Sequence, residues 1–482
     1  MVARFFRDAS LFSLVSFAEK GVALVTFPLL ASQLSPAEYG LFDLTCIAVS
    51  IASLGAGLEL YQGVMRQLPD AKSDRERGEL LSTAMVSVIV MAVIICLLAL
   101  PFWKSISSLV YAEPGQAKLL CLGAALLIAN CMSSLLYVTL RAQLRMRVLV
   151  RVAILRLAVQ TSAALWLVLG AHWKAEGLIC AQITGAALVV VACWRACGNL
   201  LHLTWNRQAF MKLFAFSGPL LAGSLCVILS QQGDRAAVRA LLTIADVGVL
   251  GTGYRVAAVV GLVTSGVEMA LSPLIYQYYT RGETPAQIAR MLRIYLGLCF
   301  LLCLGLALFA GPLLQRFTPP AYHAAAATVP ILGATLMLGH LPSFFPGLAI
   351  ANRTKTMALI QISGLAVNLC GFILLGGLFG LMGICFSGLM TQLYVLIVSA
   401  RLSHRHYPIP LPWLELAVFS GIAAGVVTLW IAYLPHTLLA GIPIVAAGVA
   451  LVFLFRLISV HDVRQALLRI TAARAARSAG RS

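Results

Sequence analysis

Charged side chains lie inside the apolar runs of this sequence, and they are the residues with which it could do chemistry. Lys20 and Arg255 fall near the middle of two such runs, where a charge costs about 2.5–3.5 kcal/mol on insertion scales and should face a partner or a watery cavity. An ammonium and a guanidinium in such a cavity suit a phosphate or pyrophosphate group, because charge-assisted hydrogen bonds are strong. We therefore predict that Lys20 and Arg255 bind an anionic substrate. Internal ion pairs are the alternative, with these acids as partners: Asp43, Glu59 and Asp234.

Acidic residues in the same runs are candidates for ion coupling. Glu19 is the neighbour of Lys20, and because adjacent helical residues point about 100° apart, the two side chains should face different helices. A carboxyl inside a membrane can take up a proton or help to hold a sodium ion. The candidates for coupling are Glu19, Glu59 and Glu268. Asp43 opens a small, polar helix face that suits either a cavity wall or a close helix contact.

The composition places these charges inside a membrane protein. Hydrophobic residues make up 61% of the 482 residues and charged residues only 11%, whereas soluble domains are about one quarter charged. The net charge of +18 would suggest nucleic acid in a soluble protein, but here Lys and Arg gather in alternate short loops, which is the signature of membrane insertion. We therefore expect an all-α polytopic membrane protein that does not bind nucleic acid.

Apolar runs of about 20 residues, the length that crosses a bilayer as a helix, recur along the whole chain. They predict about fourteen spans, near 10–32, 41–65, 79–101, 117–140, 150–170, 176–197, 210–232, 245–272, 290–315, 325–350, 356–378, 380–400, 413–434 and 437–458. With the N-terminus inside, few basic residues fall in the outer loops: Lys104, Lys118, Lys174, Arg235, Arg239 and Arg316. The positive-inside bias therefore predicts that both termini are cytoplasmic.

Motifs for enzymatic chemistry are missing from the sequence. It contains no GxxxxGK(S/T) loop to cradle nucleotide phosphates and no HExxH or GxSxG motif, and no loop is long enough to hold a folded domain. We therefore predict no catalytic residues, no metal site and no cofactor. The expected protein is a transporter, not an enzyme, driven by a proton or sodium gradient or by downhill substrate flow.

A short internal repeat divides the chain. Residues 34–42, LSPAEYGLF, resemble residues 242–250, LTIADVGVL, at a constant offset of 208 residues from Leu34 to Leu242. In each copy a hydroxyl residue, Ser35 or Thr243, precedes an acid by three positions, which is the capping-box pattern that starts a helix. Both copies follow a predicted span that leaves the cytoplasm, so the repeat predicts two parallel halves with substrate bound between them.

Longer segments resemble a known family. These are a polar first span, LSPAEYGLFDL at 34–44, FSGPLLAGSL at 216–225, QQGDRAAV at 231–238 and ADVGVLGTGYRVA at 245–257. With these segments the chain resembles polysaccharide-biosynthesis flippases of the multidrug/oligosaccharidyl-lipid/polysaccharide exporter superfamily. The resemblance covers essentially the whole chain.

The resemblance implies two six-helix lobes around a shared cavity, at 1–200 and 201–402. Two further spans at 403–460 and a basic cytoplasmic tail at 461–482 would follow, with the tail either on anionic headgroups or in solvent. The implied activity is to flip an undecaprenyl-diphosphate-linked oligosaccharide across the bacterial inner membrane by alternating access, for lipopolysaccharide or exopolysaccharide synthesis. Implied partners are that lipid, the surrounding membrane lipids, a polysaccharide polymerase and a chain-length regulator.

The resemblance also assigns roles to particular residues. In such flippases, cations on the first and eighth spans are thought to attract the lipid diphosphate, and Lys20 and Arg255 occupy those spans here. The family has an Asp-Arg pair at the end of the seventh span, which Asp234 and Arg235 match. Both residues therefore join Asp43 as candidates for the cavity wall.

Three alternatives remain. Lipid II flippases resemble this pattern but tend to carry several arginines in the early spans, where this chain has one lysine. Multidrug exporters usually have twelve spans, which the last two predicted spans argue against, whereas Glu19 in the first span favours them. A polysaccharide polymerase or ligase would need a sizeable periplasmic loop, and every predicted outer loop is short.

Overall fold

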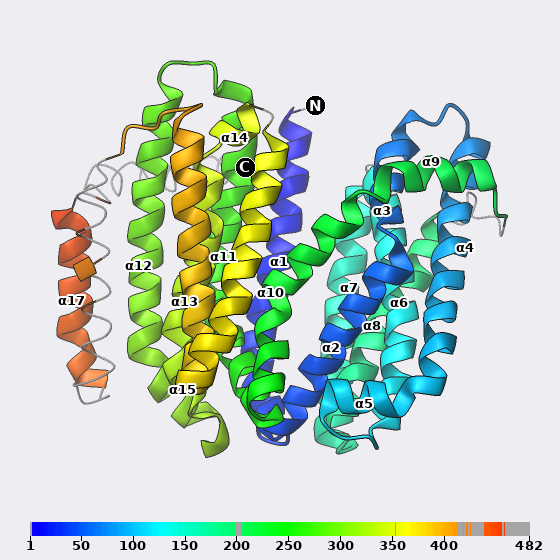
Figure 1. Cartoon of the computed structure of the whole chain (residues 1–482), viewed down its shortest axis with the longest axis horizontal. Coiled ribbons are helices and arrows are strands. Elements are labelled where there is room, and N and C mark those ends of the chain that lie inside the picture. Colours follow the sequence, from blue (N-terminus) through cyan, green and yellow to red (C-terminus); the bar gives the residue numbers. More distant parts are fainter. Residues whose placement is uncertain are drawn as a thin grey trace, which may run out of the picture. The chain divides into compact units, whose positions relative to one another are not determined.

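The computed structural model describes residues 2–143, 145–197, 204–351, 353–411 and 438–455, with the single residues 418, 421, 422, 425 and 457. Within this part of the chain every regular element is a helix (Figure 1). Nine helical segments of it are long and apolar enough to cross a membrane, so the prediction of an all-α, multi-pass membrane protein is confirmed. The predicted tail at 461–482 and almost all of the predicted span at 413–434 lie outside the described residues.

The chain packs as two compact units. The first contains Met1–Arg255, Thr318–Tyr322 and Gln361–Gly388, and the second contains the described residues of Val256–Phe317, His323–Ile360 and Leu389–Ser482. The predicted lobe boundaries, at residues 200 and 402, stay a prediction.

Ten helices lie wholly in the first unit: α1 (Val2–Ala31), α2 (Pro36–Gly57), α3 (Leu60–Gln67), α4 (Asp74–Ala99), α5 (Trp103–Tyr111), α6 (Ala117–Ala142), α7 (Met146–Leu165), α8 (Ala175–Cys197), α9 (Arg207–Ser217) and α10 (Leu220–Leu241). Helix α6 packs against α2, α4 and α8, while α7 packs against α1 and α8. The short helix α9 crosses the ends of α3 and α4 (Figure 1). This packing brings α1, α2, α7 and α8 around a common space.

Polar side chains set where several of these helices begin. Ser35 caps α2, Ser73 caps α4 and Asn206 caps α9, each accepting a hydrogen bond from a backbone N–H in the first turn. Such a bond satisfies one of the free donors at a helix start.

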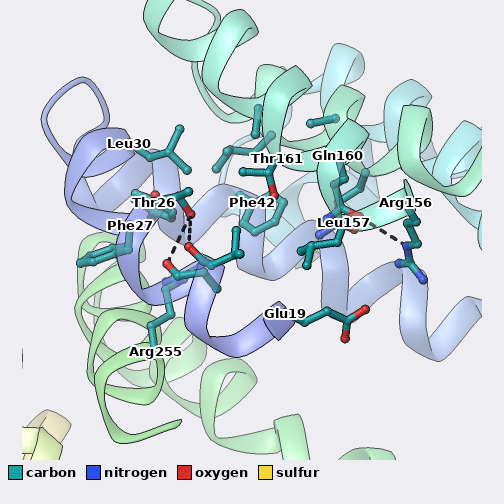
Figure 2. Close-up of a pocket in the computed structure, with 17 residues that line it drawn as sticks. Glu19, Thr26, Phe27, Leu30, Phe42, Arg156, Leu157, Gln160, Thr161 and Arg255 are labelled. Atoms are coloured by element: carbon teal, nitrogen blue, oxygen red, sulfur yellow. Dashed lines mark hydrogen bonds between the residues drawn. The ribbon is translucent and has the colours of Figure 1, made fainter. Parts of the chain in front are cut away.

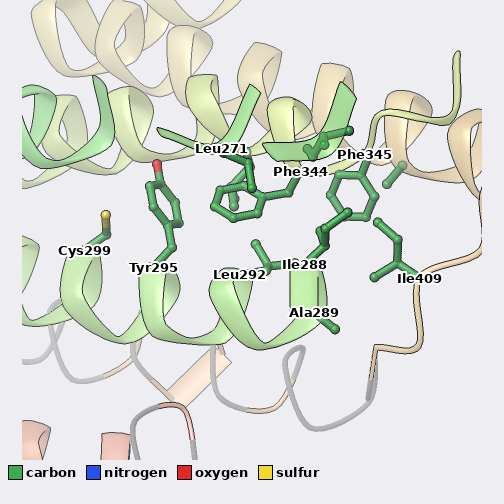
Figure 3. Packing of buried hydrophobic residues seen from close by; sticks show 12 residues of the cluster. Leu271, Ile288, Ala289, Leu292, Tyr295, Cys299, Phe344, Phe345 and Ile409 are labelled. Carbon is green, nitrogen blue, oxygen red and sulfur yellow. The ribbon is translucent and has the colours of Figure 1, made fainter. Parts of the chain in front are cut away.

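The second unit has its own core. It holds α12 (Thr284–Phe317), α13 (Ala325–His340), α14 (Gly347–Ile350) and α17 (Leu438–Leu454), and shares α11 (Ile244–Tyr278) and α15 (Thr354–His404) with the first unit. Tyr295 of α12 lies against the ring of Phe344 with 5.1 Å between ring centroids, and its hydroxyl donates to the Met337 carbonyl at 2.9 Å (Figure 3). These contacts join α12 to α13 and to the segment that follows α13.

Three predicted spans are not the single helices that hydropathy suggested. The span at 325–350 is divided between α13, which ends at His340, and α14, with a short 3-10 turn at Leu341–Phe344 between them. The span at 41–65 is interrupted at Leu58 and Glu59, which both have left-handed backbone conformations, with φ of 46° and 53°. The span at 210–232 is divided between α9 and α10 at Gly218 and Pro219, because proline has no N–H to continue a helical ladder. Asp234 and Arg235 therefore lie inside α10 instead of closing a span, which corrects their predicted position.

A different break agrees with the prediction. Helix α15 is interrupted at Gly380, where φ is 58° and ψ is −135°, a conformation open almost only to glycine. The break separates the predicted spans at 356–378 and 380–400, which are therefore confirmed as two helices. Helix α10 is not among the nine apolar segments, and it carries Asp234, Arg235 and Arg239 within its length.

Candidate functional site

Both copies of the internal repeat form the predicted capping box. The Glu38 carboxylate accepts from the backbone N–H of Ser35 at 2.7 Å, and Ser35 Oγ accepts from the N–H of Glu38 at 3.3 Å. Asp246 accepts from the N–H of Thr243 at 3.1 Å, and Thr243 Oγ1 accepts from the N–H of Asp246 at 3.2 Å. The two copies therefore start α2 and α11 by the same local mechanism, as the sequence pattern predicted.

Four charged side chains meet where these two helices approach α10: Asp43, Asp234, Arg235 and Arg255. Arg255 Nη2 donates a hydrogen bond to Asp43 Oδ1 at 2.8 Å, and Arg235 Nε lies 3.9 Å from Asp43 Oδ2. Arg235 also pairs with Asp234, at 3.5 Å from Nη1 to Oδ1. We call these four residues the charge cluster. Their side chains are between 11 and 21% exposed, so the attractions within this neutral group are stronger than between charges in water.

Aromatic rings hold the two guanidinium groups in place. The Arg255 guanidinium carbon lies 4.6 Å from the centre of the Tyr39 ring, and that of Arg235 lies 4.6 Å from the Tyr254 ring. Tyr39 packs in turn against Phe27 and Tyr322, at 5.6 and 6.1 Å between centroids. Cation–π attraction and packing therefore restrict both arginines to one orientation.

A pocket of about 360 Å³ lies beside the charge cluster, in the same unit (Figure 2). Helices α1, α2, α7 and α8 form its walls, and one residue of α11 completes it. Its wall combines apolar and aromatic side chains with six strongly polar ones: Glu19, Arg156, Gln160, Thr161, Gln182 and Arg255. This mixture is typical of a site that binds and orients a polar ligand.

The structure separates the two cations that were predicted to act together. Arg255 lines the pocket and also pairs with Asp43. The sequence analysis predicted these two positions as alternatives, and Arg255 has both. Lys20 is half-buried and does not line this pocket, whereas its neighbour Glu19 does. Because adjacent helical residues diverge by about 100°, only one of the two can face the pocket.

The other predicted acids lie elsewhere. Glu59 is 2% exposed and occupies the left-handed break between α2 and α3, and its Oε2 has no hydrogen-bond partner among the described groups. Glu268 lies in α11, but its side chain is outside the part that the structure describes. The roles of Glu19, Glu59 and Glu268 in ion coupling stay predictions.

The sequence reasoning missed four of these six polar pocket residues: Arg156, Gln160, Thr161 and Gln182. Arg156 Nε donates to Gln160 Oε1 at 3.4 Å, one turn further along α7 (Figure 2). Gln182 Nε2 donates to Cys46 Sγ at 3.6 Å. The sequence feature that could have revealed Arg156 and Gln160 is their i, i+4 spacing within an apolar span. Burial of such polar groups in a membrane costs free energy, so they should face a partner or a polar cavity.

The polar groups of this pocket are suited to binding. Arg255 and Arg156 offer guanidinium donors to an anion, and the two glutamine amides both donate and accept, as hydroxyl-rich ligands require. Among the described residues no cluster of three or more His, Cys, Asp or Glu side chains could hold a metal ion. The guanidinium and amide groups of this pocket are therefore suited to contact with a polar, partly anionic group.

Comparison with known proteins gives the chain a family context. A family model described as "Polysaccharide biosynthesis protein" matches residues 29–326. No curated protein matches the chain in sequence.

Solved structures share the fold. The chain superposes on the lipid II flippase MurJ in an inward closed conformation with a TM-score of 0.69, at 14% identity, covering 92% of this chain and 97% of that one. It also superposes on an inward-facing multidrug resistance MATE family transporter of the MOP superfamily, with a TM-score of 0.61, 12% identity, and coverage of 80% and 93%. A Vibrio cholerae MATE transporter in a bent form matches with a TM-score of 0.51, 16% identity, and coverage of 83% and 100%. At these identities the likeness shows the fold alone.

Proposed function

The chain belongs to the polysaccharide biosynthesis protein family, and on that premise we propose that it flips an undecaprenyl-diphosphate-linked oligosaccharide repeat unit from the cytoplasmic to the periplasmic leaflet. The movement proceeds by alternating access and supplies surface or exopolysaccharide synthesis. The proposed location is the bacterial inner membrane, and the distribution of Lys and Arg predicts that both termini are cytoplasmic.

The observation that carries this proposal is the polar pocket with Arg255 at its edge. A lipid-linked sugar has three chemically distinct parts, and the surroundings of this pocket offer a surface to each. The diphosphate suits the guanidinium of Arg255, the sugar hydroxyls suit the amides of Gln160 and Gln182 and the hydroxyl of Thr161, and the polyprenyl chain suits the lipid that surrounds the helices. A polar headgroup could cross the bilayer in such a pocket without losing all of its hydrogen bonds.

Coupling to an ion gradient is assigned to the acids. Glu19 lines the pocket, so a proton or sodium ion bound there would change the charge that the substrate meets. Glu59 is buried at a helix break, where a change of charge would be felt strongly. A polysaccharide polymerase and a chain-length regulator would act on the same lipid once it is flipped.

Two other transport functions have the same fold. Lipid II transport needs a diphosphate site as well, and ion-coupled drug export is favoured by one observation, the acidic Glu19 in the pocket wall beside aromatic Phe27 and Phe42. The alternatives differ in cargo, so the cargo must be measured.

A deletion strain tests the proposal. We expect the lipid-linked oligosaccharide to accumulate on the cytoplasmic face and polymer export to stop, with both effects reversed by the wild-type gene and not by Arg255→Ala at equal membrane abundance. Normal polymer export in a strain without a second flippase would exclude this cargo. Drug hypersensitivity with a normal glycan would support export of drugs instead, and a lethal block in peptidoglycan synthesis would support lipid II.

A further inference from the structure

The two copies of the internal repeat contact each other closely at a glycine in each copy. A Cβ on Gly40 of α2 would lie 2.1 Å from the carbonyl oxygen of Ile244, and a Cβ on Gly248 of α11 would lie 1.8 Å from the carbonyl oxygen of Pro36. Real side chains never approach a backbone oxygen so closely. Only glycine at both positions therefore allows the starts of α2 and α11 to meet at this distance.

These contacts are reciprocal. The repeat offset of 208 residues carries Gly40 onto Gly248 and Pro36 onto Ile244, so each copy offers the carbonyl of its first helical residue to the glycine of the other. A contact with this local two-fold relation uses the same surface twice, which is the geometry of an isologous interface. The residues that the internal repeat shares therefore form a self-complementary contact between two helices.

One turn further along, the two helices have different residues at corresponding positions, and this difference allows an ion pair to form. The same offset carries Asp43 onto Gly251, and a Cβ on Gly251 would lie 2.0 Å from Asp43 Oδ2. The missing side chain leaves room for the Asp43 carboxylate to cross to α11 and accept the 2.8 Å hydrogen bond from Arg255. We call Pro36, Gly40, Asp43, Ile244, Gly248, Gly251 and Arg255 the repeat latch.

Electrostatics favour a contact that can open. Two helix starts lie side by side, and their partial positive charges repel each other. The carboxylates of Glu38 and Asp246, in the first turn of each helix, offset that repulsion. The glycine contacts contribute close packing but no hydrogen bond between side chains, so the Asp43–Arg255 pair is the main directional bond that holds the latch closed.

From these observations we infer that the repeat latch is a reversible closure, and that an anionic group entering the pocket opens it by taking Arg255 from Asp43. Arg255 is the residue that belongs to both the latch and the pocket wall, and its Nη1 has no hydrogen-bond partner among the described groups. Because that nitrogen is also buried, an anion in the pocket can bind it only as the guanidinium turns away from Asp43. This inference rests on the proposed transport function, and it assigns regulation to the same site.

Amide hydrogen exchange on the purified full-length protein tests the latch. Gly40→Ala and Gly248→Ala should each raise exchange about tenfold in both segments, 36–44 and 244–252, because opening of the contact frees both helix starts together. The matched control is Gly57→Ala in α2, where an added Cβ meets no atom within 4 Å, and it should leave both segments unchanged. Faster exchange only in the segment that carries the substitution would overturn the reciprocal latch.

A second variant covers the case in which an alanine at the contact prevents folding. Asp43→Asn keeps the size of the side chain and removes its charge, so it should open the latch without a steric clash. Inorganic pyrophosphate added to the wild-type protein should raise exchange in the same two segments and have no further effect in Asp43→Asn. Unchanged exchange in Asp43→Asn, or no response of the wild type to pyrophosphate, would contradict the inference.

The outcomes separate the latch from the cargo. If exchange responds as expected but the deletion strain exports normal polymer, the proposed cargo is wrong and the latch stands. If the deletion strain traps lipid-linked oligosaccharide but the exchange of both segments is insensitive to every variant, the latch alone is wrong.

Discussion

The carboxylate of Asp43 on α2 is bound by the guanidinium of Arg255 on α11 at 2.8 Å, across 212 residues of sequence. This bond joins the two helices that the copies of the internal repeat begin, and Arg255 also forms part of the wall of a polar pocket. Its two partners are therefore expected to act both on stability and on transport, and the following variants separate those effects.

Removal of one partner should be worse than removal of both. Asp43→Ala leaves Arg255 largely buried without its carboxylate, and loss of one member of a buried pair costs about 3–5 kcal/mol. The double variant Asp43→Ala with Arg255→Ala should recover part of that stability. Thermal unfolding of the four proteins in detergent measures the coupling between the two sites, and strictly additive losses would show that the pair contributes nothing as a pair.

Arg156 should be needed for transport and not for folding. It lines the pocket on α7 and donates to Gln160, so Arg156→Gln should reduce polymer export at unchanged membrane abundance. Arg151→Gln is the matched control, because Arg151 is an exposed arginine on the same helix. Equal loss of export in both variants would mean that the charge of the helix matters and the pocket does not.

Lys20 and Glu19 should differ in their effects. Neutralising Lys20 is expected to impair transport at normal abundance if it attracts the lipid diphosphate before the pocket is entered. Glu19→Gln changes a pocket wall residue, so it should alter the dependence of transport on the ion gradient. Complementation assays in cells with and without an uncoupler distinguish the two roles, and reduced abundance of Lys20→Met would indicate a structural ion pair.

The break in α15 should be intolerant of any side chain. Gly380 has φ of 58° and ψ of −135°, and a non-glycine residue held there costs about 1–3 kcal/mol. Gly380→Ala should therefore lower the unfolding temperature. Gly377→Ala, three residues earlier with open space around the added Cβ, should not, and similar losses in both would show that the conformation of Gly380 is unimportant.

The two capping boxes should contribute equally to the free energy of unfolding. Ser35→Ala and Thr243→Ala each remove an acceptor for a backbone N–H at a helix start, which costs about 0.5–2 kcal/mol. Chemical denaturation of both variants measures the loss. An effect in one copy and none in the other would mean that the repeats are not physically equivalent.

Hydropathy and local motifs predicted most helices and both helix starts, because these depend on residues close in sequence. The break at Leu58 and Glu59 was missed because no proline marks it in the sequence. The residues of the charge cluster were predicted as candidates. The sequence did not single out Asp43 as the partner of Arg255, because that pairing depends on the distance between the two side chains, which helix packing sets. The α7 and α8 side of the pocket was missed for the same reason, since Arg156 and Gln182 meet α1 only after α7 and α8 have packed.

We propose that this protein moves a lipid-linked oligosaccharide across a bilayer. The direct test reconstitutes the purified protein into vesicles that contain undecaprenyl-diphosphate-linked oligosaccharide with a fluorescent label on its sugar, and measures the fraction that an impermeant quencher reaches. With wild-type protein the inner-leaflet fraction should become accessible, whereas with Arg255→Ala only the outer-leaflet fraction should be quenched. Equal quenching in wild-type, Arg255→Ala and protein-free vesicles would contradict the account.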